Sequence, residues 1–262
     1  MPDVRIIDVT DSPSRMDDVR VLFMAYAKDI GIDLCFQGFE TELAELPGCY
    51  AAPWGCILLA EVDREPVACV ALRPIDEKTG EIKRLFVRPE FRGHGLARRL
   101  ATEVVNAGFE CGYSRLLLDT LSSMTAARKL YESLGFKPTE AYYDNPLPDV
   151  CYYELDLHDH ARRHVARHAR KLGSGKWGVT LYNDDDTTMD EVVELIRDFC
   201  GYDTALAEAL MRICHLHGSV IIQRCDRQEV ALAQIALMEA WCERRDVPLN
   251  IVVYRIPDHL LR

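Results

Sequence analysis

Residues 91–97 read Phe-Arg-Gly-His-Gly-Leu-Ala and lie between a predicted strand and a predicted helix. Glycines allow a backbone to approach a ligand closely, and the free N–H groups at the start of a helix can bind a pyrophosphate. Arg92 adds a positive charge to this turn. The segment is neither the dinucleotide fingerprint, whose last glycine is missing, nor a P-loop, because no Gly-Lys-Ser/Thr follows. By itself it indicates either an anion-binding turn or a plain connection between a strand and a helix.

A second segment, residues 183–189, reads Asn-Asp-Asp-Asp-Thr-Thr-Met. A calcium loop starting at Asp184 would need Gly at its sixth position and Glu at its twelfth, and the sequence has neither. Thr188 and Glu191 match a capping box, which predicts the start of a helix. The cap leaves Asn183 and Asp184 without an obvious structural task, so a site for a positively charged group is a further interpretation of this segment.

A third segment, residues 158–176, is rich in histidine and arginine and contains a Gly-Ser-Gly sequence near its end. On a helix, His160, His164 and His168 would lie on one face, a spacing that suits a transition metal. The neighbouring arginines would repel a cation, however, and no cysteine or carboxylate is suitably placed to complete a ligand set. We therefore expect residues 159–176 to form a basic, solvated linker, and we expect no metal site.

The whole chain has 262 residues, 48% of them hydrophobic, and a formal net charge of -11. This length favours two domains, and the acidic balance argues against nucleic acid as a partner, since phosphates need a basic surface. The ten cysteines include no Cys-x-x-Cys pair, which is typical of reduced thiols in the cytoplasm. The N-terminus lacks a signal-peptide pattern and no apolar stretch could span a bilayer, so we expect a cytoplasmic protein that binds no membrane.

Hydrophobic periodicity divides the first part of the chain into strands and helices. Strands are predicted at 4–9, 56–62, 67–75, 81–87, 115–120 and 151–157, and helices at 15–30, 37–46, 96–107 and 125–134. Hairpins outnumber crossovers in this order, which indicates an α+β domain around a mostly antiparallel sheet. We place this domain at residues 1–158.

The pattern after the linker indicates a second, smaller α/β unit, which we place at residues 177–262. Strands are predicted at 179–182, 219–225 and 249–255, and helices at 189–200, 204–217 and 228–244. The sequence shows no internal repeat that would relate this unit to the first one.

Two segments of the first domain carry a family resemblance: EIKRLFVRPEFRGHGLARRL (81–100) and AARKLYESLGF (126–136). Together they resemble the GNAT superfamily of acetyl-CoA-dependent N-acyltransferases, and the resemblance extends over roughly residues 3–157. In this comparison Arg92, Gly95 and Ala97 match the pyrophosphate-binding signature of the family. The resemblance implies the GNAT fold, a mixed and mostly antiparallel sheet with flanking helices, and transfer from acetyl-CoA to an amine.

The resemblance also implies roles for individual residues. Tyr131 matches the tyrosine that, in many members, protonates the departing coenzyme A thiolate, and Glu81 is the carboxylate that we predict as the general base. A bulged strand edge would bind the thioester carbonyl through backbone N–H groups. Met124 departs from the pattern, because many members have an asparagine there. The predicted cofactor-binding residues are Leu85, Phe86, Val87, Arg92, Gly93, His94, Gly95, Leu96 and Ala97.

Residues 177–255 resemble ClpS, the bacterial adaptor that captures proteins through a destabilising N-terminal residue. The matching motifs are a strand, Asn-Asp-Asp, Thr-x-Met, and then Leu-Met-x-x-x-His followed by a glycine. The resemblance implies that Asn183, Asp184 and His215 bind the free α-ammonium of a client. It also implies an apolar pocket for the first side chain of the client, with Leu181, Thr187, Met189, Val192, Met211 and Cys214 as its predicted residues.

One departure concerns the partner protein. The ClpS family docks on a Clp unfoldase partly through a Glu and a Lys on the helix after the third strand. Glu229 can match the acid, but Gln234 stands at the place of the lysine. A Clp unfoldase is therefore a weaker expectation than a peptide client.

The two resemblances together predict an acetyl-CoA-dependent N-acetyltransferase that recruits proteins or peptides with a free, bulky hydrophobic N-terminal residue. Two alternatives stay open at this point. The chain is a Clp-protease adaptor with a regulatory acetyl-CoA site, or it acetylates a small metabolite amine and uses its second domain to sense a ligand.

Overall fold

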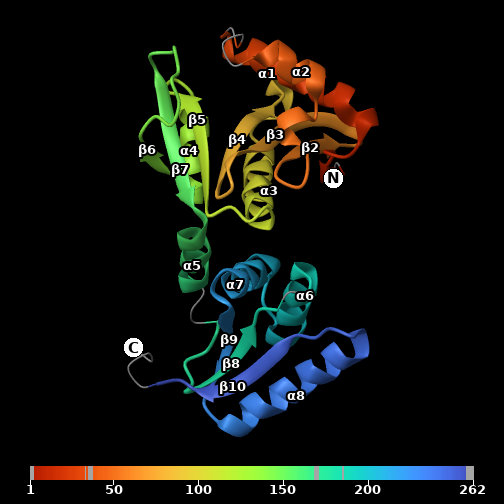
Figure 1. Ribbon diagram of the computed structural model, residues 1–262, viewed down its shortest axis with the longest axis vertical. Helices are drawn as coiled ribbons and strands as arrows, with labels where there is room; N and C mark the ends of the chain where they lie inside the picture. Colours follow the sequence, from red (N-terminus) through yellow and green to blue (C-terminus); the bar gives the residue numbers. More distant parts are fainter. Residues whose placement is uncertain (1–2, 33, 35–37, 168–170, 185, 258–262) are drawn as a thin grey trace. The chain divides into compact units, whose positions relative to one another are not determined.

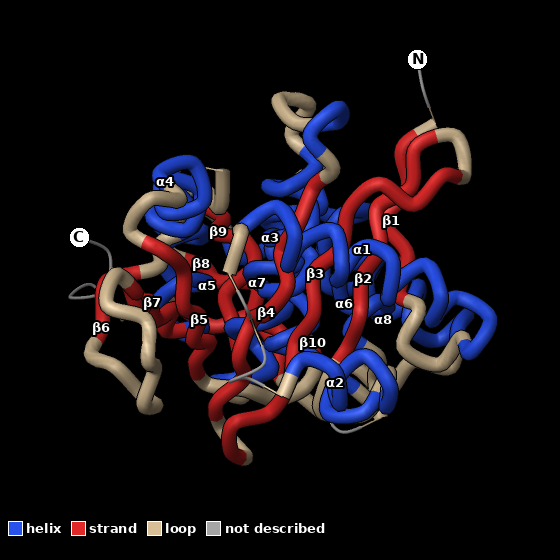
Figure 2. The backbone as a smooth tube through the Cα atoms, turned by 90° about the horizontal axis from the view of Figure 1, so that it is seen from above, coloured by secondary structure: helices blue, strands red, loops and turns tan. Residues whose placement is uncertain are grey.

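The computed structural model describes residues 3–257 except 33, 35–37, 168–170 and 185, together with all side chains in these ranges except those of Arg162, His164 and Arg167. The chain divides into two compact units, Met1–Leu157 and His158–Arg262. Figures 1 and 2 show the elements of both units, and each unit is described by itself. Within the described parts, no helix has the length and apolar character needed to cross a membrane.

The first unit is built on a mixed sheet of seven strands in the order β1-β2-β3-β4-β5-β7-β6. The strands are β1 (Val4–Asp8), β2 (Cys56–Val62), β3 (Glu65–Asp76), β4 (Thr79–Val87), β5 (Arg115–Leu121), β6 (Lys137–Thr139) and β7 (Val150–Asp156). All neighbouring strands are antiparallel except β4 and β5, which run parallel. The short strand β6 was not predicted, because three residues are too few to show a periodic pattern.

Helices cover both faces of this sheet (Figure 1). They are α1 (Met16–Ile30), α2 (Phe39–Glu45), α3 (Leu96–Glu110) and α4 (Thr125–Leu134). Helix α1 packs on β3 and β4, and its buried residues Val19, Leu22 and Phe23 share one core with Ile57 and Cys69 of the sheet. Side chains alternate along a strand, so the other buried residues of β2 and β3 face α3, which packs against both strands.

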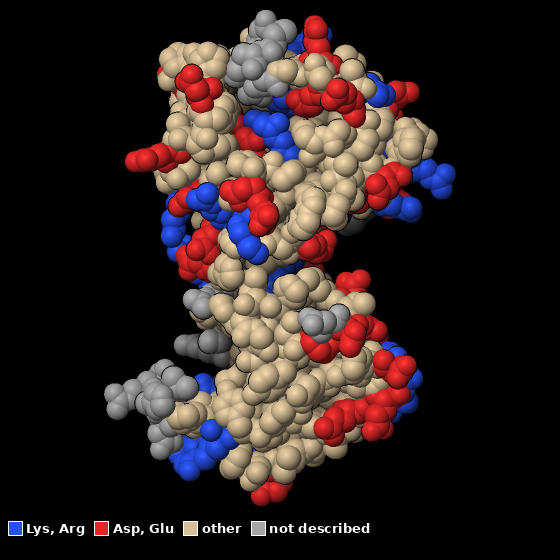
Figure 3. Space-filling model, in the orientation of Figure 1, with Lys and Arg blue, Asp and Glu red and all other residues tan. Residues whose placement is uncertain are grey.

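The second unit contains three antiparallel strands in the order β10-β8-β9 and four helices among its described residues. The strands are β8 (Trp177–Tyr182), β9 (Ser219–Cys225) and β10 (Asn250–Arg255); the helices are α5 (Leu157–Arg167), α6 (Met189–Cys200), α7 (Thr204–His217) and α8 (Gln228–Arg245). Alternate residues of β8, Val179 and Leu181, are fully buried in a core that α6, α7 and α8 complete. On the face shown in Figure 3, acidic and basic side chains are mixed on the first unit, whereas the middle of the second unit is uncharged.

Described parts of the segment predicted as a linker form a helix or pack against the second unit. Its first part continues as helix α5, and Leu172 is only 8% exposed within the core of the second unit. The backbone N–H of Arg224 in β9 donates to the Leu172 carbonyl at 2.6 Å, and the Arg224 side chain donates to the Gly175 carbonyl at 3.1 Å. Of the three stacked histidines, His168 and the side chain of His164 lie outside the described residues.

Candidate functional site

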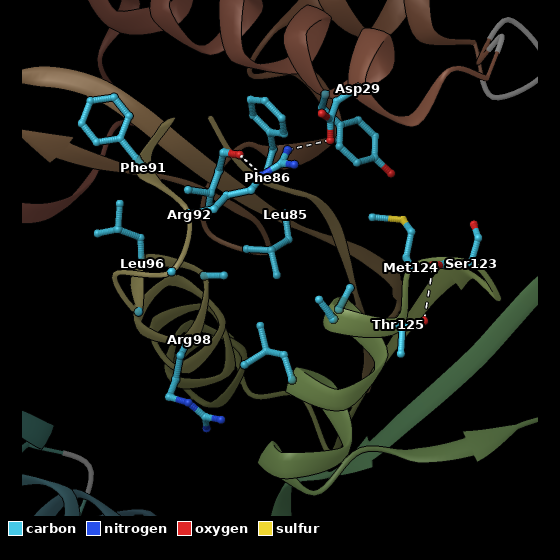
Figure 4. Close-up of a pocket in the computed structure, with 18 residues that line it drawn as sticks. Asp29, Leu85, Phe86, Phe91, Arg92, Leu96, Arg98, Ser123, Met124 and Thr125 are labelled. Atoms are coloured by element: carbon cyan, nitrogen blue, oxygen red, sulfur yellow. Dashed lines mark hydrogen bonds and ion pairs between the residues drawn. The ribbon is translucent and has the colours of Figure 1, made fainter. Parts of the chain in front are cut away.

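The first unit contains a cavity of about 620 Å³ beside the glycine turn. Figure 4 shows the side chains that line it, which come from α1, β4, the glycine turn, α3 and α4. The predicted cofactor residues in its wall are Leu85, Phe86, Val87, Arg92, Gly93, Gly95, Leu96 and Ala97. His94 is the predicted residue that does not line the cavity; it is exposed, and its Nδ1 lies 3.4 Å from the carbonyl oxygen of Phe91.

The backbone conformation of the glycine turn requires glycine at positions 93 and 95. Gly93 and Gly95 have φ values of 84° and 80°, a left-handed region that costs other residues about 1–2 kcal/mol. A Cβ atom at either position would meet nothing within 4 Å, so conformation and not space selects glycine here. Gly95 is the N-cap of α3, whose first turn contains no acidic residue, so the positive end of the helix dipole faces the cavity uncompensated.

Arg92 is held in place from two sides. Its Nε donates to the Val87 carbonyl at 2.9 Å, and its Nη2 donates to the Asp29 carboxylate of α1 at 2.6 Å (Figure 4). The residue therefore connects the turn to both β4 and α1, and its charge lies at the edge of the cavity.

Part of this wall was missed by sequence reasoning. Arg98, in the first turn of α3, lines the cavity and donates to the Ser133 hydroxyl at 2.8 Å. The start of α4 forms the opposite wall through residues 123–127, with Met124 as the N-cap (Figure 4). The arginine was detectable as a basic residue directly after the glycine turn, whereas the approach of α4 depends on tertiary packing.

Strand β4 carries a bulge beside the cavity, where Arg84 and Leu85 lie opposite a single residue of β3. Arg84 has a φ of 60°, which is uncommon for a residue other than glycine. Strand β4 pairs with β5 through Thr79–Glu81 only, so the β5 ladder does not use the backbone groups at the bulge. Bulges of this kind expose donors to a ligand next to the strand.

An ion pair holds the unusual conformation of Arg84. Its Nε and Nη2 donate to the Glu42 carboxylate of α2 at 2.9 and 2.5 Å, and the pair is buried. The Tyr50 hydroxyl also donates to Glu42, at 2.7 Å. Burial alone would raise the pKa of Glu42, but the hydrogen bonds and charge of Arg84 outweigh it and lower the pKa below its ordinary value. Helix α2 is thereby tied to the bulge.

Tyr131 lines a smaller cavity of about 40 Å³. Leu85 and Met124 line both this cavity and the large one, so the two adjoin at the bulge. Burial raises the pKa of the Tyr131 phenol above its ordinary value, which keeps the hydroxyl protonated at neutral pH. This position and protonation state fit a proton donor for a leaving group in the large cavity.

Glu81 lines neither cavity and is 2% exposed. Its carboxylate accepts hydrogen bonds from Arg73 at 2.7 Å and from the Tyr142 hydroxyl at 2.8 Å. Lys83 lies 3.4 Å away on the same strand. The structure therefore places the predicted base within a buried network of charges.

The second unit contains a cavity of about 20 Å³ between the loop before α6, α6 itself and α7. The residues of its wall are Asn183, Asp184, Thr187, Met189, Val192, Met211, Cys214, His215 and Leu249. Leu181, which we predicted in the pocket, is instead fully buried in the core, and its carbonyl accepts a hydrogen bond from Cys214 at 3.5 Å. Leu249 was not predicted, since it precedes β10 and reaches the cavity only through the fold.

The carboxylate of Asp184 has a structural task that the sequence did not reveal. Its Oδ1 accepts hydrogen bonds from the backbone N–H groups of Asp186 and Thr187 at 3.0 and 2.6 Å, and its Oδ2 accepts one from the Thr187 hydroxyl at 2.9 Å. The predicted capping box of Thr188 and Glu191 is confirmed. Asp184 thus keeps the loop closed and still contributes to the wall of the cavity.

Helix α7 presents three neighbouring side chains to this cavity: Met211, Cys214 and His215. Met211 and Cys214 are buried, whereas His215 is exposed at the rim. Burial raises the pKa of the Cys214 thiol to about 11, so the thiol is neutral at physiological pH and serves as apolar lining. The arrangement combines an apolar interior with polar groups at its opening.

Comparison with known proteins defines the class of each unit. The model of the acetyltransferase (GNAT) family matches residues 27–136, and the model of the ATP-dependent Clp protease adaptor protein ClpS matches residues 173–252. A crystal structure of a GNAT-family acetyltransferase from Staphylococcus aureus covers 59% of this chain and 99% of its own, with a TM-score of 0.50 and 20% identity. That similarity shows the fold of the first unit.

The relatives in sequence are N-acetyltransferases. An uncharacterized N-acetyltransferase of Schizosaccharomyces pombe is 39% identical over 153 residues, which are 58% of this chain and 94% of that protein. N-acetylaspartate synthetase of Homo sapiens is 38% identical over 113 residues, which are 42% of this chain and 37% of that enzyme. The chain belongs to the GNAT family of N-acetyltransferases, and its second unit contains a ClpS domain.

Proposed function

We propose that this N-acetyltransferase takes its acetyl group from acetyl-CoA and acts on proteins or peptides that its ClpS domain recruits through a free, bulky hydrophobic N-terminal residue. The observation that carries the proposal is the small cavity of the second unit. Eight of the nine residues predicted from the ClpS resemblance line it, the exception being Leu181.

The large cavity of the first unit fits acetyl-CoA. A pyrophosphate suits the N-terminus of α3, where two glycines leave the backbone uncovered and the first turn lacks acidic residues. Arg92 and Arg98 add positive charge, and the apolar wall formed by Leu85, Phe86 and Leu96 suits a pantetheine arm. When bound there, acetyl-CoA would supply an activated acetyl thioester.

Three groups of the chain contribute to the proposed reaction. Backbone N–H groups at the bulge of β4 stabilise negative charge on the carbonyl oxygen. Tyr131, which burial keeps protonated, gives a proton to the departing sulfur. A carboxylate must accept the proton of the incoming ammonium; the predicted base, Glu81, is paired with Arg73 and lies 3.4 Å from Lys83.

In the second unit, we assign the ammonium of the client to Asn183, Asp184 and His215. A carboxylate with neutral acceptors beside it suits an ammonium, and Met189 and Met211 suit several bulky side chains because methionine adapts its shape. An ammonium held in this way is not a nucleophile. The client is therefore released for acetylation of its α-amine, or it is acetylated on a nearby lysine while bound.

Acetylation of the α-amine would remove the positive charge on which recruitment depends. The proposed reaction would then prevent the client from binding to any protein that recognises a free N-terminal residue. We place the reaction in the cytoplasm, which agrees with the free thiol state of every cysteine that the structure describes.

The two alternatives receive less support. The side chain of Gln234 donates to the Phe199 carbonyl at 3.2 Å, so the position of the expected docking lysine is occupied by an intramolecular contact. A dicarboxylic amino acid, suggested by the N-acetylaspartate synthetase relatives, would need unpaired cations. Around the Tyr131 cavity, Lys83 is paired with Asp119, and Arg84 with Glu42.

Turnover on peptides of the form X-Ser-Lys tests the proposal, with X as Phe, Leu or Ser and fragmentation mass spectrometry to locate the acetyl group. The proposal predicts faster acetylation of the Phe and Leu peptides than of the Ser peptide. Equal rates for all three peptides would sink the recruitment model. Turnover of free amino acids without turnover of any peptide would favour the small-metabolite alternative.

A further inference from the structure

The cavity that contains Tyr131 also contains a carboxylate that no sequence motif identified. Asp119 lies on β5, beyond the point where the pairing of β4 with β5 ends at Glu81 and Leu117. Its side chain is 15% exposed, and it is the acidic residue among the described residues that line this cavity. The cavity thus brings a carboxylate, a phenol and the bulge of β4 together.

Glu81 lies outside this cavity, and Lys83 lies between the carboxylates of Glu81 and Asp119. The Nζ of Lys83 is 2.8 Å from Asp119 and 3.4 Å from Glu81. Lys83 is 6% exposed and therefore shielded from solvent. If a second cation approaches Asp119, Lys83 keeps a carboxylate partner in Glu81, so no buried charge is left alone.

We propose that Asp119 is the general base that takes the proton from the acceptor's ammonium, and that the acceptor is a primary amine bound in the cavity between Asp119 and Tyr131. This assignment rests on the proposed acetyltransferase function. Glu81 is then a positioning residue that acts through Lys83.

The protons, bonds and electron pairs of the proposed step are all accounted for. One proton passes from the ammonium to the Asp119 carboxylate, and the freed lone pair of the nitrogen forms the new N–C bond. The C–S bond breaks, and its electron pair leaves with the sulfur, which receives a proton from Tyr131. The nitrogen then gives up its second proton, which restores the Tyr131 phenol, and the carboxylic acid of Asp119 releases its proton to solvent, so one proton is released overall.

The other groups that face Asp119 are poor competitors for this proton. They are Lys83 of β4, Tyr26 of α1, Tyr131 of α4, Tyr152 of β7, and Tyr142 and Tyr143 of the segment before β7. Burial raises the pKa of each of these tyrosines, so their hydroxyls stay protonated at neutral pH. Arg84 is bound to Glu42, and Glu81 is bound to Arg73.

The pH dependence of Asp119→Asn tests the assignment. In the wild-type chain, kcat/KM should be nearly constant between about pH 6 and the pKa of the amine, which is about 8 for an α-amine. Without this base, the variant can acetylate only the fraction of substrate whose amine is already neutral. Its kcat/KM should therefore rise tenfold per pH unit over that range. At pH 6 we expect a loss of about 100-fold or more, in line with general-base catalysis. Above the pKa of the amine, the loss should shrink to below about tenfold.

Three further measurements keep the test decisive. Acetyl-CoA binding by calorimetry should be unchanged in Asp119→Asn. Asp119→Glu should restore the flat profile, because it keeps a carboxylate in the cavity. Glu81→Gln should lower thermal stability and leave the shape of the pH profile as in the wild type, because Glu81 does not line the cavity.

The outcomes separate this inference from the proposed function. A wild-type chain that acetylates peptides, with Asp119→Asn showing the same flat profile, would overturn the inference alone. A rising profile in Glu81→Gln and not in Asp119→Asn would return the role to Glu81. A wild-type chain that transfers acetyl to no peptide and no small amine would overturn both.

Discussion

The two cavities treat the same chemical group, a primary amine, in opposite ways. In the second unit the amine would remain a cation, held at an opening formed by Asn183, Asp184 and the exposed His215. In the first unit it would meet Asp119 and lose its proton beside Tyr131. The proposed recruitment requires the charge and the proposed chemistry requires its removal, so the two tasks would need separate sites.

The cavities also differ in how far they are formed in advance. The large cavity of about 620 Å³ is framed by backbone: two glycines in left-handed conformation, a bulge and two helix starts. The small cavity of about 20 Å³ is closed by side chains, among them Met189 and Met211. A bulky side chain would enter only after these methionines rotate, so we expect the second site to adapt its shape more than the first.

Removal of the Tyr131 hydroxyl has the largest expected effect on activity, and it tests the catalytic half of the comparison. In Tyr131→Phe, kcat should fall by about 100-fold or more, the usual loss for a general acid. The ring keeps its edge contact with Phe136, whose centroid lies 5.7 Å away, so the melting temperature should stay close to that of the wild type. Steady-state kinetics with a Phe-Ser-Lys peptide measures the loss. A decrease below threefold would show that another group protonates the sulfur.

The second prediction concerns the ion pair that holds the bulge. Breaking a buried pair costs about 3–5 kcal/mol, so Glu42→Gln should lower the free energy of unfolding by an amount in that range at pH 7. The pKa of Glu42 is lower in the folded state, so its contribution is present above its ordinary value of 4.5 and is lost as pH falls through the folded value. Urea unfolding at pH 7 and pH 3.5 should therefore show a smaller difference between variant and wild type at the lower pH. A difference that does not change with pH would contradict the role of the charge.

Asp184→Asn separates the two roles of Asp184 in the second cavity, which are hydrogen bonding within the loop and charge interaction with the ammonium. The amide oxygen can still accept the hydrogen bonds of the loop, but the charge that faces the ammonium is lost. A hydrogen bond to a charged group is worth about 1.5–3 kcal/mol, so the affinity for a Phe-initiated peptide should fall by about 10-fold to 150-fold. Fluorescence anisotropy with a labelled peptide measures the change.

Thr187→Val is the matched control for this prediction. It removes the hydroxyl that donates to Asp184 and keeps the charge of the carboxylate. Its effect on peptide affinity should be smaller than that of Asp184→Asn. If the two variants lose affinity equally, Asp184 acts through the shape of the loop and not through its charge.

Gly95→Ala has the smallest expected effect and tests whether backbone conformation builds the large cavity. The left-handed φ of 80° should cost about 1–2 kcal/mol, and relief of that strain would distort the turn. We expect the dissociation constant of acetyl-CoA to rise about tenfold by calorimetry. Gly112→Ala is the control, because Gly112 has a φ of 78°, has open space for a Cβ and lies at the other end of α3. It should lower stability equally and leave acetyl-CoA affinity unchanged.

Local sequence patterns predicted the elements and the features that depend on near neighbours. The glycine turn before α3 and the capping box of Thr188 and Glu191 are examples, since each is determined by residues within one turn. The bounds of α6 and α7 also follow from helical periodicity ended by Gly201 and Gly218 in left-handed conformation.

Features that depend on tertiary structure were not predictable in this way. Asp119 joins Tyr131 only because β4 and β5 stop pairing after three residue pairs, which leaves no trace in local periodicity. Leu249 reaches the second cavity from a segment far along the chain, and Leu181 faces the core because side chains alternate along β8. The place of Glu81 at the start of a strand predicts a base, whereas its contacts with Arg73 and Tyr142 depend on tertiary structure.

In the proposed function, recruitment by the second unit selects the substrate of the first. The most direct measurement is the ratio of kcat/KM for Phe-initiated and Ser-initiated peptides, determined in the wild-type chain and in Asp184→Asn under subsaturating peptide. We expect a ratio of about tenfold or more in the wild type and a ratio close to one in the variant, with the Ser peptide unaffected by the substitution. A ratio that is the same in both proteins would contradict the proposed recruitment.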